Sequence, residues 1–266
     1  MEKNVLIRIE YDGTGFSGWQ KQPAARTVQG EIEHVLKYIA GHDIPIHGTS
    51  RTDAGVHALG PCASFIWDSP MPVEKLPEVM NRRFGAGGTG RSGAPGDIRI
   101  LSAEVMDPEF HARYSCSGKT YRYVIDKTGD IFRRKQAFQY PDAASLDIGA
   151  MRRAASYIVG THDFKCFETA GGTPRESTVR TVSALEIADG DNSIIVEITG
   201  DGFLYNMVRI IIGTLVEVGD GRRSADDVPG IIESKNRGNA GFTAPPQGLY
   251  LKEIYFKENE ECTKSE

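Results

Sequence analysis

The chain has 266 residues and a mass of 29.1 kDa, which is enough for one large domain or two of ordinary size. Hydrophobic residues make up 39% and charged residues 25%, a composition that excludes wholesale disorder and indicates a packed core. The formal net charge of −5 argues against a nucleic-acid ligand, but basic pairs such as Arg82–Arg83 and Arg152–Arg153 still allow a locally positive surface.

The sequence offers no sign of a membrane protein, a secreted protein or a metalloprotein. Its apolar runs are too short to span a bilayer, and its first residues lack the apolar core of a signal peptide. The four cysteines are scattered without a C-x-x-C pair, and the histidines lack H-x-x-x-H spacing. We therefore expect a cytoplasmic protein with reduced thiols, no membrane contact and no metal or organic cofactor.

The first half of the chain alternates strands and helices. Val5, Ile7 and Ile9 alternate with more polar residues, which predicts a strand. Val28, Ile32, Val35, Leu36 and Ile39 share one helical face, and Gly41 follows that helix. In order, the patterns predict a strand at 4–13, a helix at 27–41, a strand at 62–68, a helix at 71–84 and a strand at 97–106.

The second half repeats this order. Its patterns predict a strand at 119–126, a helix at 145–160, two strands joined by a turn within 177–200, a helix at 203–219 and a strand at 248–256. Two such β-α-β-β-α-β units predict an α+β protein with two fused ferredoxin-like domains, mainly antiparallel sheets and a catalytic cleft between the domains. We place the N-terminal domain at 1–110, the C-terminal domain at 111–258 and an acidic tail at 259–266.

Two nucleotide-binding patterns fail on their context. The segment "GAGGTG" at 85–90 fits G-x-G-x-x-G, but it follows a predicted helix and opens none, whereas a dinucleotide site needs a strand before it and a helix after it. The segment "SGKT" at 117–120 resembles the end of a P-loop, but Arg113 replaces the leading glycine. The loops at 85–96 and 165–178 are Gly- or Ser/Thr-rich and are typical of substrate-facing loops.

A single carboxylate stands out in "GTSRTDAGVHALG", residues 48–60. Asp53 in a Gly-flanked turn is most simply an Asx-turn or a helix cap. Against this reading, Arg51 and His57 lie within four residues of it, and functional side chains concentrate in loops between rigid elements. A catalytic carboxylate must stay ionised when water is excluded, and a nearby guanidinium favours the charged form.

Arg209 is the only cation in the apolar segment "YNMVRIIIGTLVEVG". A guanidinium in such surroundings is costly unless it meets an anion, although it can also reach water at the helix edge. Asp53 is the partner that we expect for it. Because the two residues lie in different halves of the chain, their pair predicts a cleft between the domains.

Tyr121 shares one face of its predicted strand with Tyr123 and Ile125. Aromatic residues on a sheet usually pack in the core, and the pattern alone favours packing. On an RNA-binding sheet, the same arrangement serves as a stacking platform for bases.

The segment "RTDAGVHA" resembles the signature of the tRNA pseudouridine synthase A (TruA) family. Similar segments follow in the order of the family and cover nearly the whole chain: "IEYDGTGFSGWQKQPAARTVQGEIE", "KTYRYVI", "GTHDFKCF", "GDGFLYNMVRIIIGTLVEVGDG" and "APPQGLYL". The chain departs from the family in "FGAGGTGRSGAPGDIRI", which is longer and richer in glycine than the usual link.

The resemblance implies an enzyme that isomerises uridine to pseudouridine in the anticodon arm of tRNA, expected at tRNA positions 38 to 40. It implies two ferredoxin-like domains, a homodimer that shares one tRNA, and no cofactor. Asp53 matches the catalytic aspartate of the family, and Arg209 matches the basic residue that pairs with it. Tyr121 matches a tyrosine that stacks on the target base, Arg51 an arginine implicated in turning the nucleotide out, and Leu249 an apolar residue under the uracil.

The reaction breaks the N1–C1′ bond, turns the uracil and rejoins it through C5. The aspartate has three open routes: attack on C1′, attack on C6 or removal of a proton from C2′. Every route needs an ionised carboxylate near the ribose and a target base flipped out of its stack. Two other readings stay open: a non-catalytic RNA-binding module and a nucleotide-binding enzyme that uses "GAGGTG".

Overall fold

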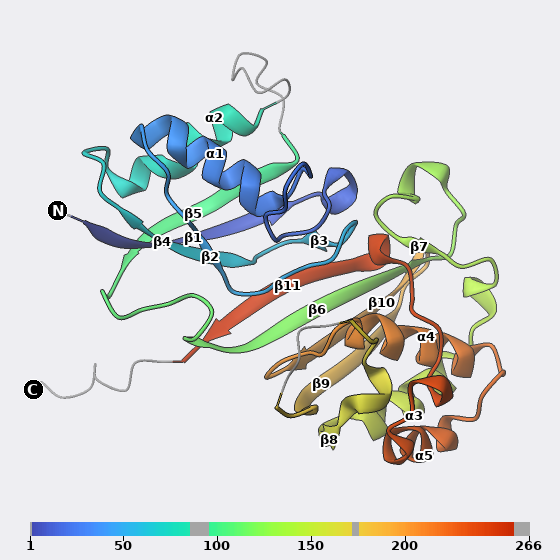
Figure 1. Cartoon of the computed structure of the whole chain (residues 1–266). Coiled ribbons are helices and arrows are strands. Elements are labelled where there is room, and N and C mark those ends of the chain that lie inside the picture. The colour runs from blue at the N-terminus through green and yellow to red at the C-terminus, as the bar shows by residue number, and fades with distance from the viewer. Residues whose placement is uncertain (1, 86–95, 172–175, 258–266) are drawn as a thin grey trace, which may run out of the picture. The chain divides into compact units, whose positions relative to one another are not determined.

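The computed structural model describes residues 2–85, 96–171 and 176–257, and the chain divides into two compact units (Figure 1). Unit 1 comprises Met1–Thr52, Ala58–Gly118 and Glu253–Glu266. Unit 2 comprises Asp53–His57 and Lys119–Lys252. A short piece of the N-terminal half, with Asp53 in it, therefore belongs to the same unit as most of the C-terminal half.

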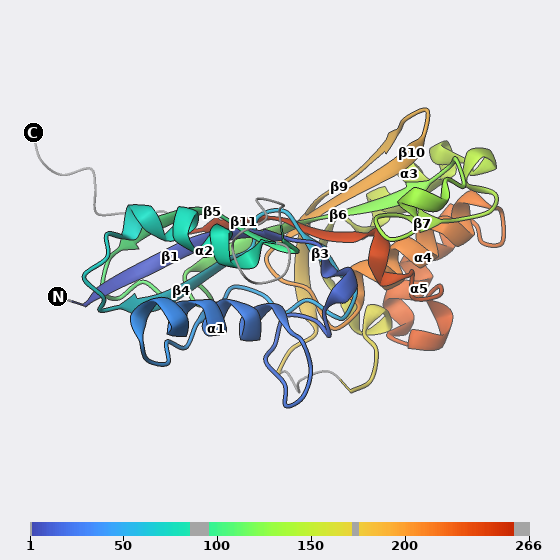
Figure 2. The ribbon, with the colours of Figure 1, turned by 90° about the horizontal axis from the view of Figure 1, so that it is seen from above.

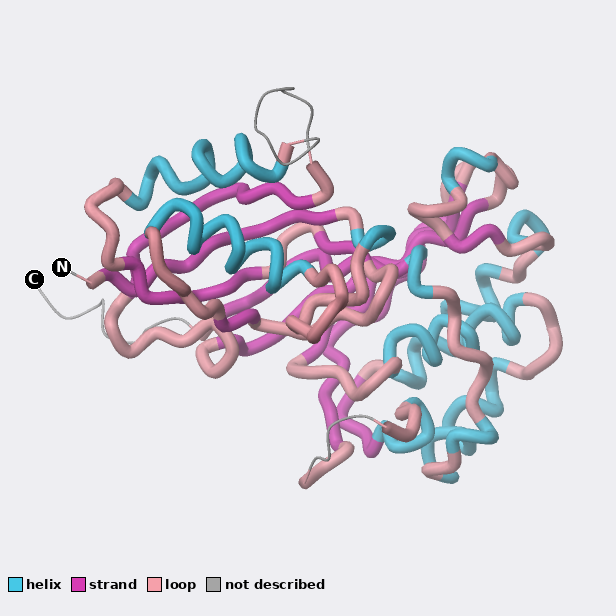
Figure 3. The backbone as a smooth tube through the Cα atoms, turned by 45° about the horizontal axis from the view of Figure 1, so that its top comes forward, coloured by secondary structure: helices cyan, strands magenta, loops and turns pink. Residues whose placement is uncertain are grey.

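Unit 1 is built on an antiparallel sheet with two helices. The elements are β1 (Lys3–Tyr11), α1 (Val28–Ala40), β2 (His47–Gly48), β4 (Cys62–Trp67), α2 (Leu76–Phe84) and β5 (Ile98–Met106). Strand β1 pairs with β4 on one side and β5 on the other, and β4 pairs with β2, so the order is β2-β4-β1-β5. Figure 3 shows both helices running across the same face of these strands.

Local sequence explains these elements. The alternating residues Val5, Ile7 and Ile9 are fully buried under the helices. Helix α1 begins after Thr27, whose side chain accepts a hydrogen bond from the Gly30 backbone, and it ends at a left-handed glycine. The polar cap, the apolar face and the terminal glycine thus agree on the same helix.

Unit 2 has a similar sequence of elements with more helices. They are β6 (Cys116–Asp126), β7 (Phe138–Gln139), α3 (Ile148–Ile158), β8 (Gly160–Asp163), β9 (Val179–Asp189), β10 (Ser193–Gly200), α4 (Met207–Gly219), α5 (Val228–Ser234) and β11 (Leu249–Phe256). The strand order is β11-β6-β10-β9-β8, and β7 pairs with β6. The unit boundaries fall within β6 and within β11, and also within the short strand β3 (His57–Ala58).

The core of unit 2 lies between this sheet and its helices. Helix α4 is buried along almost its whole length and packs against α3, and α3 packs on β9 (Figure 2). On the sheet, Tyr123 and Ile125 are fully buried, and Val196 of β10 is almost so. This packing fixes the first turn of α4, which carries Arg209, against the rest of the unit.

The helices and strands predicted from sequence are present, with two shifted helix starts. The helix predicted at 71–84 begins as an α-helix only at Leu76, because Pro77 is tolerated only in the first turn. The helix predicted at 203–219 begins at Met207, because Asn206 has a φ of 60° and interrupts the helical conformation before it. Helix α5 and strands β2, β3, β7 and β8 were not predicted.

Several predicted features lie outside the described residues. These are most of the loop at 85–96 with its "GAGGTG" segment, the middle of the loop at 165–178 and the tail at 259–266. Within the described residues, no helix is both long enough and apolar enough to cross a membrane.

Candidate active site

Asp53 begins a tight turn that only glycine can complete. The carbonyl oxygen of Asp53 accepts a hydrogen bond of 3.2 Å from the Val56 backbone, and Gly55 has a φ of +78°. A Cβ atom at Gly55 would also lie 3.2 Å from Cγ of Pro246. The glycine therefore serves both the turn geometry and a close approach, which together fix the direction of the Asp53 backbone.

Arg209 lies beside Asp53, as the sequence predicted. Its Nη1 atom is 3.7 Å from Oδ2 of Asp53, and the side chains are 15% and 38% exposed, respectively. The guanidinium is held by two further bonds: Nε donates to the carbonyl oxygen of Ala244 at 2.7 Å, and Nη1 donates to Oδ1 of Asn206 at 2.8 Å. Arg209 thus faces a carboxylate and carbonyl groups instead of extending into water.

Burial decides the electrostatics of this pair. Desolvation raises the pKa of Asp53 above its ordinary value, and the positive charge of Arg209 offsets only part of that rise. Desolvation likewise lowers the pKa of Arg209, against the opposing charge of Asp53. The guanidinium favours the charged form of Asp53, as expected from the sequence, but desolvation has the larger effect on its pKa.

Tyr121 and Tyr123 are both buried on the same face of β6. Tyr121 is 8% exposed, and its ring meets that of Phe203 edge-on at 5.2 Å. The hydroxyl of Tyr123 donates to the carbonyl oxygen of Pro245 at 2.7 Å, and the nearby charge of Arg209 acts to lower the pKa of Tyr123. Burial raises the pKa of Tyr123, so its hydroxyl stays protonated.

The segment 244–249 connects these side chains. Ala244 and Pro245 supply the carbonyl groups that bind Arg209 and Tyr123, and Pro246 packs on Gly55. A Cβ atom at Gly248 would lie 2.6 Å from the Tyr123 ring, so this position also requires glycine. Leu249, which the sequence analysis placed under the base, follows at the start of β11 and is 6% exposed.

His57 fixes the other end of the Asp53 turn. It is 2% exposed, and its Nε2 atom lies 2.8 Å from the carbonyl oxygen of Lys135, which makes that nitrogen the donor. The His57 ring stacks on Tyr250 with centroids 4.7 Å apart and planes 22° apart. The hydroxyl of Tyr250 donates to the carbonyl oxygen of Gln136 at 2.5 Å.

Sequence reasoning named Asp53, Arg209, Tyr121 and Leu249, and all four belong to unit 2. Arg51, the fifth residue, is exposed and belongs to unit 1. Three contacts around these side chains were not predicted: the bond of Asn206 to Arg209, the backbone carbonyls of 244–245, and the contacts of His57. Only the i, i+3 spacing of Asn206 and Arg209 was visible in the sequence.

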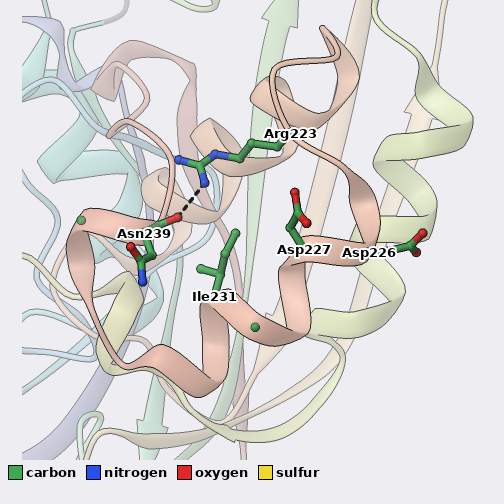
Figure 4. A pocket seen from close by; sticks show the side chains of 7 residues that line it. Arg223, Asp226, Asp227, Ile231 and Asn239 are labelled. Carbon is green, nitrogen blue, oxygen red and sulfur yellow. Dashed lines mark hydrogen bonds between the residues drawn. The ribbon is translucent and has the colours of Figure 1, made fainter.

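The described residues contain no group of three or more His, Cys, Asp or Glu side chains that could hold a metal ion. An open hollow of about 470 Å³ lies between α5 and the residues that follow it (Figure 4). Its polar side chains have structural partners: Arg223 donates to the carbonyl oxygen of Asn239 at 2.7 Å, and Asp227 accepts from the Ser224 backbone at 3.0 Å. Because neither Asp53 nor Arg209 lines the hollow, we do not assign it to the site.

The fold and site define a mixed α/β protein whose central feature is a partly desolvated carboxylate beside a guanidinium. A family model described as tRNA pseudouridine synthase matches residues 7–115 and 154–257. The chain is 46% identical over 254 residues to the tRNA pseudouridine synthase A of Acetivibrio thermocellus, a match that covers 96% of this chain and 100% of the relative. It is 42% identical over 258 residues to the tRNA pseudouridine synthase A 2 of Clostridium tetani, with the same coverage of both chains.

The chain therefore belongs to the tRNA pseudouridine synthase family. Among solved structures, a Cbf5–Nop10–Gar1 complex matches at 13% identity, over 95% of this chain and 50% of the other, with a TM-score of 0.38. That score is too low to support an argument about the fold. The family assignment depends instead on the sequence matches, which span both units.

Proposed function

We propose that this member of the tRNA pseudouridine synthase family converts uridine to pseudouridine in the anticodon arm of tRNA, at positions 38 to 40, with Asp53 as the nucleophile. The observation that carries the proposal is the arrangement of Asp53. Its carboxylate is partly exposed to solvent, lies 3.7 Å from a guanidinium and sits on a turn that Gly55 fixes. A carboxylate reserved for structure would be expected to bond its own turn or a helix end.

The chemistry needs what this arrangement supplies. The N1–C1′ bond breaks, the uracil turns, a C5–C1′ bond forms, C5 loses its proton and N1 gains one, so the product is an isomer of the substrate. The Asp53 carboxylate attacks C1′ or C6, or takes a proton from C2′, and each route uses its ionised form. Arg209 favours that form and orients it, while partial exposure leaves an oxygen accessible to the substrate.

Three further residues complete the proposed site. Tyr121 stacks on the flipped base, a contact worth about 1–3 kcal/mol that offsets part of the unstacking cost of a few kcal/mol. Leu249 contacts the uracil from its position at the start of β11. Arg51 helps to turn the nucleotide out of its stack, a role that its exposed position permits.

We also propose a ferredoxin-like fold for each half, with domains at 1–110 and 111–258. The strand orders support this. The main strands of the first half are, in chain order, β1, β2, β4 and β5, and those of the second half are β6, β9, β10 and β11. In the sheet they lie in the orders β5-β1-β4-β2 and β11-β6-β10-β9, so both halves have the strand order fourth, first, third, second. A homodimer, which the family resemblance implies, and a cytoplasmic location, which the scattered cysteines favour, complete the proposal.

The test is release of tritium from C5-tritiated uridine in tRNA. Asp53→Asn and Asp53→Ala should abolish release while tRNA affinity, measured by filter binding, stays within about threefold of the unchanged protein. Asp226→Asn serves as the matched control, because Asp226 is an ion-paired carboxylate of the same unit and should be dispensable. Turnover by Asp53→Ala at the wild-type rate would end the nucleophile assignment. If the unchanged protein binds tRNA without releasing tritium, it is an RNA-binding module instead.

A further inference from the structure

The segment Ile131–Gln136, which we call the basic turn, stands out on the surface of unit 2. Its sequence, "IFRRKQ", holds two apolar and three basic residues and no acid. Phe132 is 81% exposed and Ile131 is 62% exposed. Large apolar side chains this open to water on an ordered turn are a common mark of a contact surface.

The basic turn is held rigidly, so the exposure of Phe132 is not a consequence of a loose loop. Asp126 is almost fully buried at the end of β6 and accepts hydrogen bonds from Thr128 and the Gly129 backbone. It also forms an ion pair of 2.7 Å with Arg133. The side chain of Asp130 caps the turn by accepting from the Phe132 backbone at 2.9 Å.

The charges of the basic turn are only partly balanced. Arg133 is neutralised by Asp126, whereas the structure gives no carboxylate partner to Arg134 or Lys135 among the described residues. Arg134 donates one hydrogen bond to the carbonyl oxygen of Ile131, which leaves most of its donors available. Asp130, which caps the turn, offsets part of this charge, but Arg134 and Lys135 still leave a net positive charge beside the exposed ring of Phe132.

The basic turn is also joined to the candidate active site. The carbonyl oxygen of Lys135 accepts from His57, four residues beyond Asp53, and that of Gln136 accepts from Tyr250, which stacks on His57. These side-chain contacts join the basic turn to the Asp53 turn within unit 2, although the two turns lie on separate segments of the chain.

We propose that the basic turn is a contact surface for the tRNA substrate, outside the residues that hold the target uridine. An unpaired base stacks on the exposed ring of Phe132, and the side chains of Arg134 and Lys135 bind backbone phosphates. Stacking on an aromatic ring beside cations is the usual way in which proteins hold unpaired nucleotides. The inference rests on the proposed function, because it takes tRNA as the substrate.

Two sets of substitutions test the proposal by filter binding of tRNA at several salt concentrations. Phe132→Ala should weaken binding at least about fivefold, and Phe132→Trp should restore it, because indole also stacks. The double variant Arg134→Ala/Lys135→Ala should weaken binding and reduce the steepness of its salt dependence by about 1.5 in the log–log slope, the value for two lost phosphate contacts. The turnover number at saturating tRNA should stay within about twofold in the two Phe132 variants.

The double variant Arg153→Ala/Lys235→Ala is the matched control. It removes two exposed cations of the same unit, each of which pairs with a carboxylate, and it should leave the tRNA affinity unchanged. Unaltered tRNA affinity in both Phe132→Ala and Arg134→Ala/Lys135→Ala would overturn the proposal. Unaltered affinity together with a changed sedimentation coefficient would instead identify the basic turn as a contact between copies of the chain. The unchanged protein's tritium release tests the proposed function separately, since it does not depend on these variants.

Discussion

Replacement of Arg209 by methionine should shift the pH dependence of catalysis in a defined direction. Arg209 lowers the pKa of Asp53, while burial raises it by more, so Asp53 titrates above its ordinary value of about 3.9. In the proposed reaction the ionised carboxylate is the active form, so kcat/KM should rise with pH through this pKa. Loss of the guanidinium removes the opposing influence and should move the acid limb to higher pH.

The size of the shift follows from the geometry. Two unit charges 3.7 Å apart interact by about 1 kcal/mol in water and about 4 kcal/mol at an effective dielectric constant of 20. Because Asp53 is 38% exposed, solvent screening places the value toward the lower end. We expect a loss of about 1–2 kcal/mol, which moves the acid limb upward by about one pH unit.

The assay is kcat/KM for tritium release measured across the acid range, with tRNA binding followed at each pH. Below both the original and the shifted pKa, Arg209→Met should lose about tenfold in kcat/KM beyond any loss at high pH. Arg209→Lys keeps the charge but not the planar donors that bind Ala244 and Asn206, so its acid limb should stay near that of the unchanged protein while kcat falls. If the acid limb of kcat/KM falls at the same pH in Arg209→Met and in the unchanged protein, Arg209 does not lower the pKa of Asp53.

Two predictions concern stability. Asp53→Asn should raise the melting temperature by a few degrees at pH 7.5, because desolvation makes the ionised carboxylate costly in the folded state and raises its pKa. The gain should begin to shrink as the pH falls through that raised pKa, and it should vanish near the ordinary pKa of the carboxyl group. A melting temperature lowered at neutral pH would contradict this. Gly55→Ala should destabilise the protein by about 1–2 kcal/mol, since φ is +78° there and the new methyl group meets Pro246. It should also lower kcat, because it displaces Asp53. Calorimetry and tritium release check these two effects, and full activity would show that the turn does not set the position of the carboxylate.

The sequence pointed to the Asp53–Arg209 pair more clearly than to the residues around it. Asp53 was found because a lone carboxylate with Arg51 and His57 nearby is unusual, and Arg209 because an isolated cation in an apolar helix needs an anion. The first argument depends on functional side chains that are close in the sequence, and the second on a charge within an apolar segment; both patterns can be read from the sequence. The pairing of residues 156 positions apart was inferred only because each had an unmet electrostatic need.

The balance of effects at Asp53 was not predictable in the same way. Whether burial or the guanidinium dominates its pKa depends on how much solvent reaches the carboxylate, which is set by packing around Gly55, Pro246 and α4. The start of α4 is another example. Its apolar pattern extends back to Phe203, but Asn206 adopts a left-handed conformation, so the helix starts only at Met207. The side chain of Asn206 then accepts a hydrogen bond from Arg209.

By itself, the amino-acid sequence determined the order of strands and helices, the family and the residues with unusual electrostatic requirements, because periodicity and charge are local properties of the chain. The tertiary structure alone decided that residues 53–57 join the unit formed by most of the second half, and that backbone carbonyls of 244, 245, 135 and 136 hold the site. The reason is physical: every residue carries the same carbonyl group, so only the folded backbone selects which of them meet Arg209, Tyr123, His57 and Tyr250.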